Sequence, residues 1–359
     1  FGDTSIARMS GALSNQTRAV HAGTTSPFSN IIDFVTIATT GDAQDFGDLV
    51  EPQSLFAGAS SSTRGVFGGG RNNTPSENTL HNTMQYITIA TTGDAQDFGD
   101  LLDKLFDGAG NISSRTRQFS YMGRRGGDAS VSTNAIEFIT YSSTGNSTDF
   151  GDSTSNLYYQ PSGLSNATRG MRGGGSINPS TGGINVIDFI TMASEGNAVD
   201  FGDLQNQLRY GCGVASPTRG IFLWGNSHPS TANIMEFITI STTGNSQDFG
   251  DLVDPVGTAA AGNATRGLAA QGNGTIQSIQ LATLGNAVQF GTLSTTRSNI
   301  NAASSPTRII FAGGVISPNT YSNIIDYASI QTEGQAVDFG DLTVNRHTDN
   351  ASSNAHGGL

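Results

Sequence analysis

Pairs of carboxylates recur along the chain in the phrase Asp-Phe-Gly-Asp, and two acids in one tight turn could help to hold a calcium ion. Full copies lie at 45–48, 97–100, 149–152, 200–203, 248–251 and 338–341. A degenerate copy, Gln-Phe-Gly-Thr, lies at 289–292, and a partial copy, Phe-Gly-Asp, lies at 1–3. Calcium usually takes about six to eight oxygen ligands. Two carboxylates are too few for a closed site, so we expect no metal here, although calcium binding by a single repeat stays open.

A Thr-Arg pair also recurs, with its arginines at Arg18, Arg64, Arg117, Arg169, Arg219, Arg266 and Arg308. These guanidinium groups could form a ring of ligand-binding cations. Alternatively, each arginine pairs with an acid of its own or a neighbouring repeat, such as the phrase aspartate. We favour the structural alternative, because repetition of a scaffold alone accounts for seven copies.

Other residues that commonly carry chemistry are sparse. Cys212 is the only cysteine, so neither an intrachain disulfide nor a cysteine-based zinc site is available, and the five histidines have no ligand spacing. No phosphate loop, nucleophile elbow or His-Glu metal motif is present. The glycine run at 68–70 precedes a turn-rich loop rather than a helix. The sequence therefore predicts a protein that is not an enzyme and has no cofactor.

The spacing of the phrase predicts the architecture. Its phenylalanines lie at positions 1, 46, 98, 150, 201, 249, 290 and 339. A period of about 40 to 50 residues without helical patterning is typical of propeller blades. We predict a single all-β domain, a seven-bladed β-propeller with four antiparallel strands per blade. The repeat units are 4–49, 50–101, 102–153, 154–204, 205–252, 253–293 and 294–342, with 343–359 as a closing or exit strand.

Four strands can be recognised in each unit. A run of small residues such as 57–61 suits the crowded position nearest the axis, and a strand such as 63–68 begins at Thr-Arg and ends in glycine. A nearly continuous apolar strand such as 32–37 follows, which indicates burial on both faces. The phrase itself, as in 43–49, forms the last strand. We expect its phenylalanine to pack between sheets at the outer edge of each blade.

The two ends of the chain leave the closure of the ring open. The segment 351–356 echoes the inner-strand sequence 303–308, which gives eight candidate inner strands for seven blades. Either the N-terminal strand completes the first blade and the C-terminal one leaves the ring, or the two ends compete for one place. The chain begins at Phe1, in the middle of a phrase, so we expect it to be a fragment or processed form of a longer protein.

Charge limits the possible partners. The formal net charge is −12, but 13 of the 29 acids belong to the phrase and five more occupy one repeated strand position, namely Asp33, Glu137, Asp188, Glu236 and Asp326. A nucleic-acid binder would need a basic patch, so we expect no nucleic-acid partner. No apolar stretch approaches the ~20 residues of a transmembrane helix, and we expect no membrane insertion.

Variable loops on a rigid scaffold are natural binding elements. Several candidate contact residues lie around the loop after the second strand, namely Arg71, Arg124, Arg125, Arg172, Trp224 and His228. Arginine and tryptophan often anchor interfaces, so these residues could bind a protein or a glycan. Equally, they could be ordinary solvated loop residues.

The repeat resembles the kelch repeat of galactose-oxidase-like propellers. The glycines at 68–70, 173–175 and 313–314 match the kelch glycines, and Phe46 and its equivalents stand where kelch repeats usually carry tryptophan. Galactose oxidase would imply a copper site, but the position of Cys212 and the histidine spacing do not match one. The amino-acid sequence of the third and fourth strands is similar to repeats of virion structural and tail-fibre-type proteins of marine tailed phages, especially cyanophages.

These resemblances and the absence of catalytic motifs lead to two functional hypotheses. The first is a structural or adhesion module on the surface of a phage virion, which binds a host surface glycan or protein or a neighbouring virion protein through its variable loops. Such a module could be a homo-oligomer within a larger assembly. The alternative is a cytoplasmic, kelch-type scaffold for protein interactions.

Overall fold

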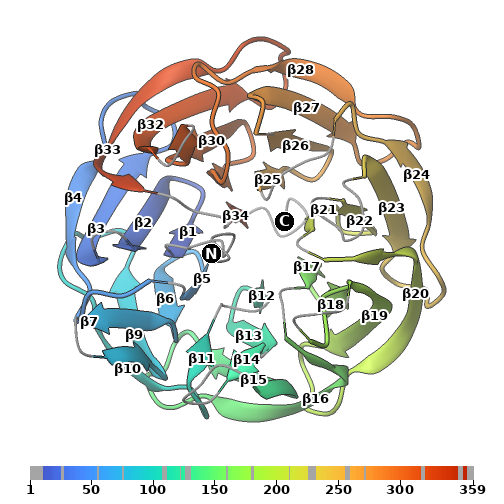
Figure 1. Ribbon diagram of the computed structural model, residues 1–359, viewed down its shortest axis with the longest axis horizontal. Coiled ribbons are helices and arrows are strands. Elements are labelled where there is room, and N and C mark those ends of the chain that lie inside the picture. The colour runs from blue at the N-terminus through green and yellow to red at the C-terminus, as the bar shows by residue number, and fades with distance from the viewer. Residues whose placement is uncertain are drawn as a thin grey trace, which may run out of the picture.

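The computed structural model describes residues 11–25, 28–54, 56–74, 77–106, 111–121, 123–125, 131–158, 161–178, 182–209, 211–224, 232–254, 259–270, 272–316, 320–346 and 351–353. These residues form strands, turns and loops, and none of them is helical. Seven sheets are arranged around a central axis like the blades of a propeller (Figure 1). The predicted all-β, seven-bladed propeller with four antiparallel strands per blade is therefore confirmed.

Each blade has an inner, a second, a third and an outer strand, and the blades are numbered 1 to 7 along the chain. In that order, the inner strands are β1 (Gly11–Ser14), β5 (Ala57–Ser60), β12 (Asn111–Ser113), β17 (Ser162–Ser165), β21 (Cys212–Ala215), β25 (Ala259–Gly262) and β29 (Asn301–Ser304). The second strands are β2 (Arg18–Thr25), β6 (Arg64–Gly68), β13 (Arg117–Tyr121), β18 (Arg169–Gly173), β22 (Arg219–Leu223), β26 (Arg266–Ala270) and β30 (Arg308–Ala312).

The third strands are β3 (Phe28–Thr36), β9 (Thr83–Thr88), β15 (Val131–Thr140), β19 (Ile184–Thr191), β23 (Ile234–Thr239), β27 (Thr275–Gln280) and β32 (Thr320–Ser329). The outer strands are β4 (Gln44–Asp48), β10 (Gln96–Asp100), β16 (Thr148–Leu157), β20 (Val199–Leu208), β24 (Gln247–Asp251), β28 (Val288–Thr292) and β33 (Val337–Arg346). Every outer strand carries the phrase. Its predicted place at the outer edge is thus confirmed.

Three outer strands continue past the ends of their predicted repeat units. These strands, β16, β20 and β33, pair with third strands that are also long, for example at Ser322 opposite Arg346. Short additional strands extend other loops. They are β7 (Arg71–Thr74) with β8 (Glu77–Leu80), β11 (Leu105–Phe106) with β14 (Arg124–Arg125), and β31 (Val315–Ile316).

The eighth candidate inner strand neither leaves the ring nor takes a place in blade 1. Blade 1 is built from one continuous segment, β1 to β4. The C-terminal strand β34 (Ala351–Ser353) lies near the centre of the ring and pairs in parallel with β29, Ala302 opposite Ala351 (Figure 1). It therefore adds to the axial edge of blade 7, while Phe1–Asp3 lie outside the described residues.

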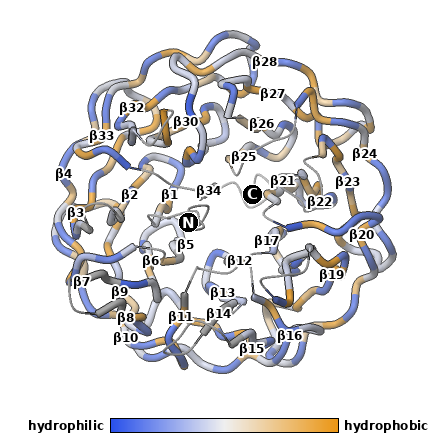
Figure 2. Tube along the Cα trace, in the orientation of Figure 1, coloured by the Kyte–Doolittle hydropathy of each residue, from blue (hydrophilic) through white to orange (hydrophobic). Residues whose placement is uncertain are grey.

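The hydrophobic core is divided among the contacts between neighbouring blades, which we call seams. Figure 2 shows hydrophobic segments in every blade rather than in one central mass. In the seam between blades 1 and 2, for example, Val20 and Phe46 pack with Phe67 and Ile89. The phrase ring of Phe46 meets Phe34 edge to face, with centroids 5.7 Å apart. Aromatic pairs in this geometry are favourable, and the phenylalanine packs between sheets as predicted.

Candidate functional site

The phrase forms a backbone clasp across every seam. In the seam between blades 3 and 4, the N–H groups of Gly196 and Ala198 donate to the carbonyls of Phe150 and Asp152, at 2.8 and 2.7 Å. Equivalent pairs of bonds occur in the other six seams, including the one that closes the ring from blade 7 to blade 1.

The phrase glycine permits this close approach. Gly151 has φ 138°, and a Cβ there would lie 2.6 Å from the carbonyl of Gly196. A side chain at this position would therefore meet backbone, and glycine has none.

Side chains of the facing turn reinforce the clasp. The backbone N–H of Asp152 donates to Oδ1 of Asn197 at 3.0 Å, and six further seams use the equivalent aspartate, asparagine or glutamine. In the degenerate copy at 289–292, Thr292 takes the place of the second aspartate and bonds Gln335 through both its N–H and its hydroxyl. The loss of both phrase acids thus leaves this seam bonded.

The repeated arginines also lie across seams. Nη1 of Arg169 donates to the carbonyl of Ile240 in the next blade at 2.7 Å, and its guanidinium lies 4.4 Å from the centroid of Phe189. The six equivalents also donate to a carbonyl of the next blade. Five of them face the third-strand ring of their own blade, whereas Arg266 lies 6.0 Å from the centroid of the phrase ring Phe290. The predicted acidic partner was therefore wrong: a carbonyl oxygen and an aromatic face hold each guanidinium.

One position of the third strand supplies a buried acceptor to each seam. The side chains are Asp33, Gln85, Glu137, Asp188, Glu236, Gln277 and Asp326. Each accepts the backbone N–H of the residue two places after the phrase of the preceding blade, as Val50 N–H donates to Gln85 at 2.7 Å. A buried polar group is costly unless it is bonded. This position therefore fastens each blade to the connection that enters it.

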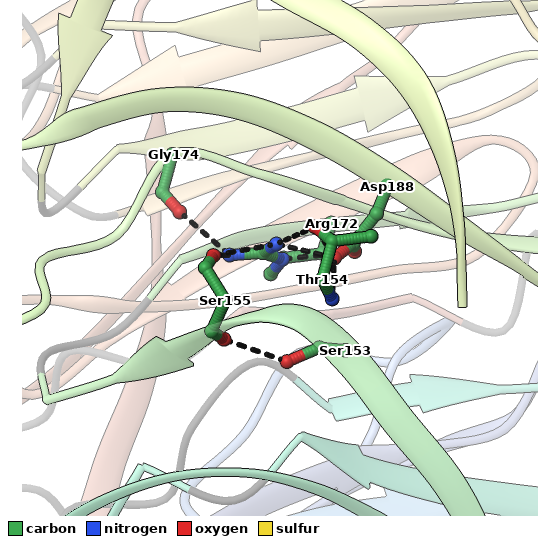
Figure 3. Close-up of polar contacts among 6 residues, drawn as sticks. All are labelled: Ser153, Thr154, Ser155, Arg172, Gly174 and Asp188. Carbon is green, nitrogen blue, oxygen red and sulfur yellow. Dashed lines mark hydrogen bonds and ion pairs between the residues drawn. The ribbon is translucent and has the colours of Figure 1, made fainter. Parts of the chain in front are cut away.

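Three of these acceptors are aspartates that bind a buried arginine. The pairs are Asp33 with Arg346, Asp188 with Arg172 and Asp326 with Arg297. In blade 4, Nε of Arg172 donates to Oδ1 of Asp188 at 2.9 Å, and the guanidinium also reaches Thr154 and Ser155 on the incoming connection (Figure 3). The two glutamates instead accept from a serine ten residues later, Glu137 from Ser147 and Glu236 from Ser246.

Two of the predicted contact residues are buried. Arg172 has 0% exposure and lies in β18 rather than beyond it, because the alternation of the strand points it towards Asp188. Trp224 has 1% exposure, and its Nε1–H donates to the carbonyl of Gln207 at 3.1 Å. Their placement on a contact surface was wrong, since neither side chain is available to a partner in this structure.

The remaining predicted residues belong to the loops. Arg71 is half-buried and its backbone pairs with Ser54 on the connection from blade 1. Arg124 and Arg125 form β14, which pairs with β11. In blades 2 and 3, the connection from the preceding blade and the loop after the second strand therefore lie on the same side of the ring. We call this side the loop face. His228 lies outside the described residues.

Backbone contacts bring several charged residues of blades 2 and 3 together on the loop face. The N–H of Gly70 donates to Leu105 at 3.0 Å, and Leu105 pairs with Arg125. Arg71 follows Gly70, and Lys104 precedes Leu105. The structure thus places Arg71 near the two predicted arginines of blade 3, across the short strand β11.

His81 joins this group and was not among the predicted contact residues. Its N–H donates to Gly70 at 2.9 Å, and its Nδ1 lies 3.9 Å from Oε2 of Glu51. Burial lowers the pKa of His81, Glu51 opposes that shift and Lys104 adds to it. We call Glu51, Arg71, His81, Lys104, Arg124 and Arg125 the loop cluster. Within it, the titratable or charged residues Glu51, Arg71, His81 and Lys104 lie together, and the backbone of Arg124 and Arg125 lies beside them.

Metal binding, thiol chemistry and a membrane-spanning helix have little support within the described ranges. They contain no group of three or more histidine, cysteine, aspartate or glutamate side chains placed to hold a metal ion. Burial raises the pKa of Cys212 to about 12, which keeps the thiol protonated at neutral pH. No helix found in these ranges is long and apolar enough to cross a membrane.

Comparisons with known proteins agree with the architecture. No family model and no curated protein matches the chain. Its structure is similar to that of the computationally designed Ika8 protein, with a TM-score of 0.56, 13% identity, and coverage of 97% of this chain and 90% of that chain. It is also similar to the structure of YjhT, with a TM-score of 0.55, 8% identity, and coverage of 92% and 99%. At these identities the likeness shows the fold alone. The fold and the seams define a seven-bladed β-propeller.

Proposed function

We propose that this propeller is a non-enzymatic adhesion or structural module of a phage virion, which binds a host surface glycan or protein, or a neighbouring virion protein, through its loop face. The division of labour among its residues carries the proposal. The repeated arginines, phrase backbone and third-strand acceptors all serve the seams. Recognition is left to the residues that differ from blade to blade, and those lie in the loops.

The loop cluster is the proposed contact site. It combines arginines of the short strands β7 and β14 with a glutamate, a histidine and a lysine of the adjoining loops over blades 2 and 3. Arginine is enriched where binding energy is concentrated. Charged groups of both signs suit a polar surface such as a glycan with hydroxyl and carboxylate groups.

Binding to cells tests the site. The purified protein, labelled with a fluorophore, is incubated with a panel of marine cyanobacteria, and bound label is measured by flow cytometry. We expect the double variant R124A/R125A, and R71A, to lose at least about tenfold in binding, equivalent to about 1.4 kcal/mol. The control R115A removes an exposed arginine at the opposite end of β13 and should bind normally. Equal binding by all variants would contradict the proposed contact site.

Electron microscopy tests the location. Gold-labelled antibodies against this propeller should decorate the surface of tailed phage particles. Labelling confined to the cytoplasm of cells would instead favour the alternative, a kelch-type scaffold for cellular partners.

A further inference from the structure

The seam between blades 7 and 1 contains a buried histidine at a second-strand position where no other blade has one. Three residues after the repeated arginine, the second strands carry His21, Phe67, Ser120, Arg172, Phe222, Ala269 and Phe311. Each of these residues pairs across the strand with the third-strand acceptor of its blade. His21 therefore occupies the place that Arg172 occupies in blade 4, opposite Asp33 instead of Asp188.

The carboxylate of Asp33 already has a cation. Arg346, which arrives from blade 7, donates from Nη2 to Oδ2 of Asp33 at 3.1 Å and from Nη1 to the carbonyl of Gly23 at 2.6 Å. The hydroxyl and N–H of Thr343 donate to the same Oδ2. In the seam between blades 6 and 7, Arg297 donates to Asp326. No histidine lies opposite that aspartate, because Phe311 takes the position of His21.

Polar atoms around His21 have no hydrogen-bond partner among the protein groups that the structure describes. They are both ring nitrogens of His21, Oδ1 of Asp33 and Nε of Arg346. All three side chains have 1% exposure or less. A second cation in this buried space would have to share one carboxylate with Arg346 and would be repelled by it.

Among the described residues, the other groups that pack against His21 offer no second carboxylate. The strand β1 on the axial side of β2 reads Gly-Ala-Leu-Ser and has no titratable side chain. From blade 7, Arg346 and Tyr327 are turned towards this part of blade 1. Arg308 and Asp341 also cross the seam, but Arg308 bonds the carbonyl of Ile37 and Asp341 faces Asp42 in the clasp. Asp326 lies on the other face of blade 7, with Arg297.

We propose that His21 is a pH-sensitive switch in the ring: protonation of its imidazole opens the seam between blades 7 and 1 and leaves the other six seams closed. In the open seam the imidazolium is hydrated and separated from Arg346. In the closed seam it is a buried, uncompensated second cation. The proton is thus a ligand that binds the open state better than the closed one.

The direction of the effect follows from the two environments. Burial lowers the pKa of His21 from 6.5 to about 4; Asp33 opposes this shift and Arg346 adds to it. A group that binds its proton less well in the closed seam favours opening as the pH falls from about 6.5 to about 4. Each unit of pKa difference is a factor of ten, so opening should be favoured by about 70-fold at pH 4.5 relative to pH 7.5.

Hydrogen–deuterium exchange tests this on the intact chain. The peptides that contain Gly41 and Ala43 report the seam between blades 7 and 1, and those that contain Gly334 and Ala336 report the seam between blades 6 and 7. We expect protection, corrected for the intrinsic rate, to fall by about 70-fold in the first seam and to change little in the second. An equal fall in both seams would overturn the proposal.

The variant H21F gives the matched comparison, because it converts this seam into the Arg, Phe and Asp arrangement of the seam between blades 6 and 7. Its seam between blades 7 and 1 should no longer respond to acid. If H21F keeps the acid response, the proposal is wrong. A measurement that needs no variant is the NMR titration of His21 in the wild-type protein. A midpoint near pH 4 is expected, and a midpoint near 6.5 would also overturn the proposal.

Discussion

Asp33 and Arg346 lie 313 residues apart in the chain and form a buried ion pair, with Nη2 of the arginine 3.1 Å from Oδ2 of the aspartate. The pair belongs to the seam that joins the last blade to the first. The Arg297–Asp326 pair takes the same positions between blades 6 and 7. The ring is therefore closed by the same kind of contact that joins two consecutive blades. Closure therefore depends on side chains and backbone hydrogen bonds at one seam.

Replacing Arg346 by glutamine should lower the free energy of unfolding by about 3–5 kcal/mol, because the change leaves Asp33 as an uncompensated buried charge. The double variant D33Q/R346Q should recover much of this loss. It copies the seam between blades 1 and 2, where Nε2 of Gln85 donates to Oε1 of Gln53 at 2.8 Å. Urea denaturation at pH 7 measures both. The surface variant R115Q should change stability by less than about 0.5 kcal/mol. A loss as small as this for R346Q would refute the proposed role of the ion pair.

Two glycines that face each other in one clasp should respond unequally to alanine. Gly99 and Gly145 have φ 135° and 149°, so alanine is strained at either position, by about 1–3 kcal/mol. A Cβ on Gly99 would also overlap the carbonyl group of Gly145, whereas a Cβ on Gly145 meets nothing within 4 Å. We expect G99A to have a clearly lower thermal midpoint than G145A. Equal midpoints would show that the seam yields to the added methyl group.

The repeated arginines should be structural, and lysine should not replace them. Arg169 uses its planar guanidinium both to face Phe189 and to reach the carbonyl of Ile240. Lysine keeps the charge but lacks this fork, so R169K should cost about 1.5–3 kcal/mol, since a hydrogen bond that involves a charged group contributes about that much. Urea denaturation with R115K as the control checks the prediction. Cell binding through the loop face should be unchanged in a folded R169K, and a selective loss of binding would point to a ligand role.

The period of the phrase was sufficient to predict the blades, because identical units can only bury their faces against one another. The third-strand acids were recognised as a repeated position, but Gln85 and Gln277 were not added to it. A signal was present, since Ser147 and Ser246 each follow their glutamate by ten residues, while alanine follows at the same distance from Asp33, Gln85, Asp188, Gln277 and Asp326. Covariation of this kind within one chain reports contact.

Other features could not be predicted from residue type alone. Arg172 has the residue type of a loop position. It lies three residues after Arg169 in β18, however, where it pairs with Asp188 and its side chain points into the seam. Trp224 lies five residues after Arg219, at the place of Gly69 and Gly174, and its Nε1–H donates to the carbonyl of Gln207. The parallel strand β34 has the small residues of an inner strand, and such a sequence fits either edge of β29.

Glu137 should make stability depend on pH in the direction opposite to His21. Burial raises the pKa of this carboxyl above its usual value, more than the bonds from Ser147 and Leu102 lower it, and Asp103 and Asp149 raise it further. A carboxyl whose folded pKa is raised costs stability at neutral pH, and that cost disappears as the pH falls through the raised pKa towards the unfolded value.

The variant E137Q removes this charge and copies the side chain found at Gln85, whose Oε1 accepts the N–H of Val50 at 2.7 Å. We expect E137Q to be more stable than the wild type at pH 7.5, and the difference to shrink as the pH approaches about 4.5. Urea midpoints across this range measure it. In E236Q the matched bonds from Gln205 and Ser246 are also present, so this variant controls for the change from glutamate to glutamine. A difference between E137Q and the wild type that did not vary with pH would show that Glu137 gains its proton no more readily in the folded ring than in the unfolded chain.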